Sequence, residues 1–199
     1  MTEIKRNINK PINAYALVAM LSLSGQGHLK NLLQNLKDDI GGGLWVMPPN
    51  ALHITLCEIV QDKNYSDNPD NIFYKNADTY INKPAHILSA YKPIAVDFNE
   101  IFASSQAIII KGNDDGSFGQ IRKQILQSMD LPAGTALPPQ IIHSSIARYT
   151  QEMPLDSVRQ VASKYTINFV EVVQEFRLIH SLVSPLQKYE AIKTYKLIN

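Results

Sequence analysis

Two short stretches of the sequence each place a histidine and a hydroxyl-bearing residue two positions apart within an apolar run. The first stretch holds His53 and Thr55, and the second holds His143 and Ser145. Side chains two positions apart on a β-strand project from the same face, so each histidine is predicted to share a face with its hydroxyl. An imidazole titrates near neutral pH, and a hydroxyl can donate a hydrogen bond to an anionic oxygen. Two such pairs facing one cleft predict acid–base chemistry on a phosphate ester without a metal.

A single pair of this kind is common by chance, and a purely structural role for both histidines is the alternative. In that alternative, His53 and His143 are hydrogen-bonded residues of a sheet and perform no chemistry. The pair occurs twice, however, both times in an apolar strand and at matching points of a repeated pattern. This repetition favours a functional interpretation.

The elements that must position the two pairs follow from the spacing of apolar residues and from turn residues. Each histidine strand is expected to follow a buried strand and an amphipathic helix, and further strands are expected to end the chain. The expected strands are 15–23, 45–46, 53–59, 94–102, 106–111, 140–149 and several within 167–197. The expected helices carry apolar stripes over 29–40, 118–129 and 155–165, with glycines 41–43 ending the first of them and Pro154 opening the last.

The order of strand, helix, proline-containing turn and histidine strand occurs twice, at nearly equal spacing. The two halves share the pattern but little identity. The sequence therefore predicts an α+β fold with two pseudo-symmetric lobes of antiparallel sheet and flanking helices around a central cleft. All 199 residues are expected to form one such two-lobed domain.

Two segments fit this pattern poorly. Residues 1–13 are polar and are expected to be an N-terminal tail. Residues 61–82 are polar and rich in asparagine, and they are expected to be an insertion in the form of a loop or lid at the edge of the cleft. A short helix is expected to open at Pro84 and run to Tyr91.

The composition limits the classes of function. With 45% hydrophobic residues the chain can form a substantial core, and 19 Lys and Arg against 18 Asp and Glu leave a net charge of +1. An anionic substrate must therefore be captured in a local pocket rather than along a basic surface. The single cysteine, Cys57, and the absence of an apolar leader or membrane-length run predict a cytoplasmic protein without disulfides.

The residues around both histidines carry a family resemblance. The stretch from Trp45 to Leu56 resembles the first motif region of the bacterial RNA 2′,3′-cyclic phosphodiesterases, also called 2′–5′ RNA ligases, in which a Trp-Val-Pro-Pro-type lead-in precedes His-x-Thr-Leu. The stretch from His143 to Arg148 resembles their second motif, His-x-Thr-Leu-Ala/Gly-Arg. These enzymes belong to the two-histidine (2H) phosphoesterase superfamily. The chain departs from the pattern at Ser145 in place of threonine, at Cys57-Glu58 in place of an apolar-Gly continuation, and in the segment 61–82.

The resemblance implies that His53 and His143 perform acid–base catalysis while Thr55 and Ser145 bind phosphate oxygens. It also implies a phosphate-binding role for Arg148. On a regular strand Arg148 would point away from His143, so a bulge or a strand end is required to bring it into the cleft. Two tyrosines are candidates for stacking on a base: Tyr149 lies in phase with His143 and Ser145, and Tyr15 begins the first strand. Core packing is the alternative role for both tyrosines.

The function implied by this resemblance is a metal-independent phosphodiesterase that acts on 2′,3′-cyclic phosphate ends of RNA or nucleotides. The expected partner is an RNA end, a cyclic nucleotide or a short oligonucleotide, bound by a monomer without a cofactor. No third ligand accompanies either histidine at a spacing typical of a metal site. Two alternatives stay open: a phosphodiesterase for 2′–5′ or cyclic oligonucleotides, and a binding module for nucleotides or RNA that performs no catalysis. The sequence does not assign base and acid between the histidines.

Overall fold

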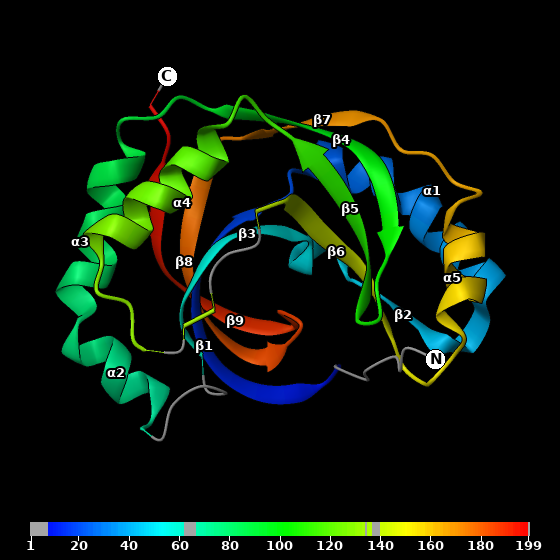
Figure 1. Cartoon of the computed structure of the whole chain (residues 1–199), viewed down its shortest axis with the longest axis horizontal. Helices are drawn as coiled ribbons and strands as arrows, with labels where there is room; N and C mark the ends of the chain where they lie inside the picture. Colours follow the sequence, from blue (N-terminus) through cyan, green and yellow to red (C-terminus); the bar gives the residue numbers. More distant parts are fainter. Residues whose placement is uncertain (1–7, 62–66, 134, 137–139, 199) are drawn as a thin grey trace.

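The computed structural model describes residues 8–61, 67–133, 135, 136 and 140–198. Within this part of the chain, nine strands form two antiparallel sheets, and five α-helices lie on their outer sides (Figure 1). The two sheets lie on opposite sides of the centre of the molecule. The predicted α+β class with two antiparallel lobes is therefore confirmed.

The first sheet has four strands in the order β3-β1-β8-β9. Their bounds are His53–Gln61 for β3, Lys10–Met20 for β1, Glu175–Ser184 for β8 and Lys188–Lys196 for β9. The second sheet has five strands in the order β2-β6-β5-β4-β7. Their bounds are Leu44–Val46 for β2, Ile142–Tyr149 for β6, Ala107–Asn113 for β5, Ile94–Ala103 for β4 and Phe169–Val173 for β7. The two predicted histidine strands thus lie in different sheets.

The helices are α1 (Leu23–Ile40), α2 (Pro69–Lys75), α3 (Ala77–Leu88), α4 (Ser117–Ser128) and α5 (Leu155–Ala162). Helix α1 is capped at its N-terminus by Ser22, whose hydroxyl accepts a hydrogen bond from the amide of Gly25. Its C-terminal cap is Gly41, whose φ of 78° favours glycine. Two 3-10 turns, Gly41–Gly43 and Pro49–Ala51, flank β2. The helices expected from the apolar stripes are confirmed, although α5 ends before Tyr165.

The helix of each half covers the sheet of the other half. Helix α1 follows β1 in the chain but contacts β2 and β7 of the second sheet. Helix α4 follows β5 but contacts β3 of the first sheet, where Phe118 meets Phe176 of β8 edge to face, with ring centroids 5.5 Å apart. Burial of both apolar faces therefore ties the two lobes together.

Two predictions for the polar segments are wrong where the structure describes them. Residues 10–13 belong to β1 rather than to an N-terminal tail, and residues 1–7 lie outside the described part. Residues 69–82 are mainly helical rather than a loop or lid, because they form α2 and the first half of α3. The buried side chains of Phe73 and Tyr80 anchor these helices to the core. Residues 62–66 lie outside the described part.

The helix expected to open at Pro84 begins instead at Ala77 and ends at Leu88, so the proline lies inside it. Among the residues that the structure describes, no helix is both long and apolar enough to cross a membrane.

Candidate active site

Strands β3 and β6 bring the two histidines together. Strand β3 is the edge strand of the first sheet, and it contacts β6 of the second sheet across the boundary between the lobes. His53 begins β3 and His143 lies one residue inside β6. The charge of His143 acts on the pKa of His53, which places the two imidazoles within electrostatic reach of each other.

Both strands show the same alternation of half-buried and buried side chains. His53 and Thr55 are half-buried, while the intervening Ile54 is fully buried. His143 and Ser145 are half-buried in the same way. The predicted sharing of a face by each histidine and its hydroxyl is therefore confirmed.

A β-bulge follows each hydroxyl residue. In the β1–β3 pairing, Thr55 and Cys57 oppose consecutive residues of β1, so Leu56 is the additional residue. In the β5–β6 pairing, Ser145 and Ala147 oppose consecutive residues of β5, so Ile146 is the additional residue. A bulge reverses the alternation of faces beyond it. The side chain that follows the bulged pair thus returns to the face of the histidine.

The second bulge turns Arg148 into the site, as its proposed role requires. Its Nη2 donates a hydrogen bond to Ser145 Oγ over 3.3 Å. Arg148 is half-buried and forms no ion pair within the part of the chain that the structure describes. A cation in this position next to a hydroxyl provides two kinds of donor for an anion.

The ring of His53 is oriented by its own backbone. Its Nδ1 lies 2.6 Å from the carbonyl oxygen of Ala51, and because a carbonyl only accepts, Nδ1 carries the proton. This tautomer leaves Nε2 as the basic atom. Burial lowers the pKa of His53 to about 4, against the opposing effect of the Ala51 carbonyl and with the help of the positive charges of Arg148 and His143.

His143 has a matching environment. Burial also lowers its pKa, the carbonyl of Ile141 opposes the change, and the cations Arg122 and Arg148 favour it. The two histidines differ in one respect: Nδ1 of His53 is hydrogen-bonded to a carbonyl, whereas Nδ1 of His143 is buried without a hydrogen-bond partner among the described residues. Both imidazoles are therefore neutral at neutral pH, and an anion bound between them would raise both pKa values.

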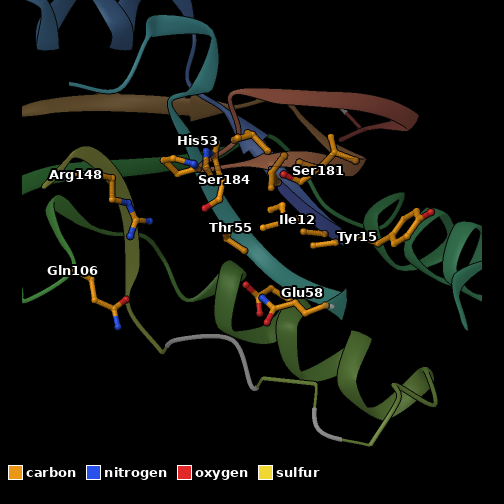
Figure 2. Close-up of a pocket in the computed structure, with 16 residues that line it drawn as sticks. Ile12, Tyr15, His53, Thr55, Glu58, Gln106, Arg148, Ser181 and Ser184 are labelled. Carbon is orange, nitrogen blue, oxygen red and sulfur yellow. The ribbon is translucent and has the colours of Figure 1, made fainter. Parts of the chain in front are cut away.

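A pocket of about 270 Å³ opens beside His53 and Thr55 on the exposed face of the first sheet. Figure 2 shows Arg148 and Gln106 approaching it from the second lobe, opposite the strand that carries Thr55 and Glu58. The pocket therefore takes polar groups from both lobes, although His143 and Ser145 are not among the residues that line it.

Arg122 of α4 supports both histidine strands from behind. It is 5% exposed. Its Nε donates to the carbonyl of Leu56 and its Nη2 donates to the carbonyl of Thr55, both over 2.9 Å. Its Nη1 donates over 3.4 Å to the carbonyl of Ile141, just before His143. The carbonyls of Thr55 and Leu56 lie at the β3 bulge, where the regular ladder is interrupted.

Both candidate tyrosines are buried, although Tyr15 contributes to the lining of the pocket. The ring of Tyr15 is stacked between Phe73 and His180, with centroids 3.9 and 4.4 Å away, and Figure 2 shows it directed toward the neighbouring helices. Tyr149 is fully buried and donates its hydroxyl hydrogen to the carbonyl of Ser104 over 2.9 Å. Both rings are therefore packed in the core, and a base-stacking role for either tyrosine stays a prediction.

Glu58 and Gln61 also line the pocket beside Thr55, and neither was expected there from the sequence. A signal for Glu58 was present, because a charged residue follows each histidine at the same spacing: Glu58 after His53 and Arg148 after His143. Gln106, from the turn before β5, carried no local signal. No cluster of three or more His, Cys, Asp or Glu side chains suited to a metal occurs among the described residues.

No family model matches this sequence, and no curated protein matches it in sequence. Solved structures do resemble it over nearly the whole chain. TT0787 of Thermus thermophilus aligns with a TM-score of 0.67 and 15% identity, covering 92% of this chain and 97% of that one. E. coli LigT complexed with 3′-AMP aligns with a TM-score of 0.61 and 13% identity, covering 94% and 99%.

A further match is a protein described as a phosphoesterase, with a TM-score of 0.62, 12% identity and coverage of 94% and 99%. Structures of E. coli LigT have also been solved with ATP and with NADP+. Because these matches cover nearly the whole chain, this chain has the two-lobed fold of E. coli LigT.

Proposed function

We propose that this protein is a metal-independent phosphodiesterase that opens 2′,3′-cyclic phosphates at RNA ends or on nucleotides. The observation that carries the proposal is the matched placement of His53 with Thr55 and of His143 with Ser145 on contacting strands of two different lobes. A binding module has no need of two titrating groups in this arrangement. The likeness in fold to LigT, which has been crystallised with 3′-AMP, supports a nucleotide as the substrate.

In the proposed reaction, water attacks the phosphorus while one neutral histidine accepts its proton. The bond from phosphorus to the ribose 3′ oxygen breaks, and the other histidine, as imidazolium, gives its proton to that oxygen. The product is a 2′-phosphate, as the family resemblance implies. Burial keeps both imidazoles neutral in the free protein, so the substrate anion is what favours protonation of one of them.

Thr55, Ser145 and Arg148 are proposed to bind the non-bridging oxygens. The hydrogen bond from Arg148 to Ser145 orders two of these donors before substrate arrives, which reduces the reorganisation needed in the transition state. Arg148 supplies the positive charge that the two hydroxyls lack. Together these groups stabilise the charge that grows on the phosphate as the bond to water forms.

The test uses adenosine and guanosine 2′,3′-cyclic phosphates, together with 2′–5′ and 3′–5′ diadenylates, each with and without EDTA. We expect the cyclic phosphates to open to 2′-phosphates at rates that EDTA does not change, and the 3′–5′ linkage to remain intact. A double variant, His53→Ala with His143→Ala, controls for contaminating nucleases. Turnover that requires a divalent ion would refute the mechanism. Tight nucleotide binding without any turnover would identify a binding module instead.

A further inference from the structure

The first sheet continues beyond Thr55 as two rows of pocket-lining side chains, set by the register of β3, β1 and β8. The nearer row is Glu58, Ala16 and Ile179, and the farther row is Gln61, Ala14 and Ser181. A second irregularity in β3, between the partners of Tyr15 and Ala16, brings Gln61 onto the same face as Glu58. Figure 2 shows Glu58 next to Thr55 along the strand.

The shape of this part of the pocket suits a flat ligand. Ala14 and Ala16 lie in the middle of the rows, where their small side chains leave space above the sheet. Ser184 at the end of β8 and the following Pro185 also line the pocket. The part of the floor formed by Ala14, Ala16 and Ile179 is therefore apolar and the edge formed by β3 is polar, which matches the apolar faces and polar edge of a nucleobase.

The position of Glu58 along β3 also fits a base. Leu56 and Cys57 together occupy one position of the β1–β3 pairing because of the bulge. Glu58 therefore lies two strand positions beyond Thr55, a distance of about 7 Å. A nucleotide whose phosphate is held at Thr55 places its base one ribose away from that phosphate. The base then lies over the alanine floor with its edge toward Glu58.

The chemistry of the rim distinguishes among the bases. The carboxylate of Glu58 only accepts hydrogen bonds, and the amide of Gln61 can donate them. Guanine presents two adjacent donors, N1–H and the 2-amino group, next to its O6 acceptor. Adenine and cytosine place a ring acceptor beside their amino group, and uracil places a carbonyl on each side of its single N–H. A carboxylate therefore forms paired hydrogen bonds with guanine alone.

From this arrangement we propose that the pocket selects guanine, with Glu58 accepting hydrogen bonds from N1–H and the 2-amino group and Gln61 donating to O6. This inference rests on the proposed function, because it assumes that the phosphate of the nucleotide lies between His53 and His143. It makes guanosine 2′,3′-cyclic phosphate, or an RNA that ends in it, the favoured substrate. Glu58 is then a residue that determines specificity rather than one that transfers a proton.

The experiment compares kcat/KM for the 2′,3′-cyclic phosphates of guanosine, inosine, adenosine, cytidine and uridine. We expect guanosine to be preferred over adenosine roughly 10- to 100-fold, the range of one paired contact, with inosine between them because it lacks the 2-amino group. Glu58→Gln should reduce the ratio of guanosine to adenosine at least about tenfold. The matched control is Glu190→Gln, which removes an exposed carboxylate from β9.

Binding provides a second measurement that does not depend on catalysis. Isothermal titration with guanosine and adenosine 2′-monophosphates should show the same preference, and Glu58→Gln should weaken it, while chemical denaturation confirms that the variant is folded. Equal turnover and equal binding of all bases would overturn this inference and leave the proposed function intact. An unchanged ratio of kcat/KM for guanosine to adenosine in Glu58→Gln would do the same. If no cyclic phosphate is hydrolysed, the proposed function fails, and the binding preference alone then decides the inference.

Discussion

The guanidinium of Arg122 donates a hydrogen bond to the backbone carbonyl of Thr55 over 2.9 Å, which ties the helix of one half of the chain to the histidine strand of the other. Two further donations from the same side chain reach Leu56 and Ile141. One buried residue thus fixes the segments that carry both histidines relative to each other. The pair of strands is held by this contact as well as by apolar packing.

Replacing Arg122 should therefore damage both stability and catalysis. Arg122→Lys keeps the charge but cannot supply three directed donors, and we expect the free energy of unfolding to fall by about 2–4 kcal/mol as buried carbonyls lose their partners. Chemical denaturation measures this change. The expected effect on activity is a larger fall in kcat than rise in KM, because Arg122 positions the histidines without touching substrate.

The control for that prediction is Lys123→Met, which removes the neighbouring exposed cation of α4. It should change the free energy of unfolding by less than about 0.5 kcal/mol. Equal losses in the Lys123 and Arg122 variants would show that the buried hydrogen bonds of Arg122 are not what stabilises this region.

The two histidines should each be essential for turnover. His53→Ala and His143→Ala should lower kcat roughly 100- to 10,000-fold, since each removes one proton transfer from the transition state. His86→Ala, a change at an exposed position of α3, serves as the control and should retain full activity. Near-normal phosphodiesterase rates in either cleft variant would exclude the acid–base pair.

The hydroxyl residues should have smaller and graded effects. Thr55→Ala and Ser145→Ala should each cost about 1–4 kcal/mol of transition-state stabilisation, while Thr55→Ser and Ser145→Thr should be mild. Ser145→Ala also releases Arg148, so its effect should be the larger of the two. Steady-state kinetics on a cyclic phosphate separates these cases. If the conservative and truncating changes were equally harmful, packing rather than hydrogen bonding would explain the losses.

The buried state of His53 should make stability depend on pH. Its pKa is lowered from 6.5 to about 4 on folding, so the unfolded chain binds more protons between these pH values. The stability of the wild-type protein should fall as pH drops from about 6.5 toward about 4, by at most about 3 kcal/mol from this residue. Above pH 6.5 the imidazole is neutral in both states, and its contribution does not change with pH.

The measurement is chemical denaturation at a series of pH values for the wild type and for His53→Asn. The variant has no titrating ring at this position, so its stability should decline less steeply over the same range. Identical slopes in the two proteins would mean that burial does not depress the pKa of this histidine.

The sequence alone determined the local features of this protein. The alternation of apolar and polar residues placed His53 with Thr55, and His143 with Ser145, because the faces of a strand follow directly from neighbour spacing. Apolar periodicity likewise located α1 and α4. The repeated order of elements indicated two lobes. The family resemblance implied a role for Arg148, and strand geometry indicated that this residue needs a bulge or a strand end to enter the cleft.

The tertiary structure decided which segments meet. Three features depend on residues far apart in the chain. They are the contact of β3 with β6, the packing of α1 and α4 each on the sheet of the other half, and the hydrogen bonds of Arg122. The bulges are defined by the register of the partner strand, so the entry of Glu58 into the pocket became visible only once β1 was paired with β3. Helices α2 and α3 were missed for a related reason. Their polar sequence contains few core residues, and it is the packing of Phe73 and Tyr80 against the rest of the molecule that stabilises them.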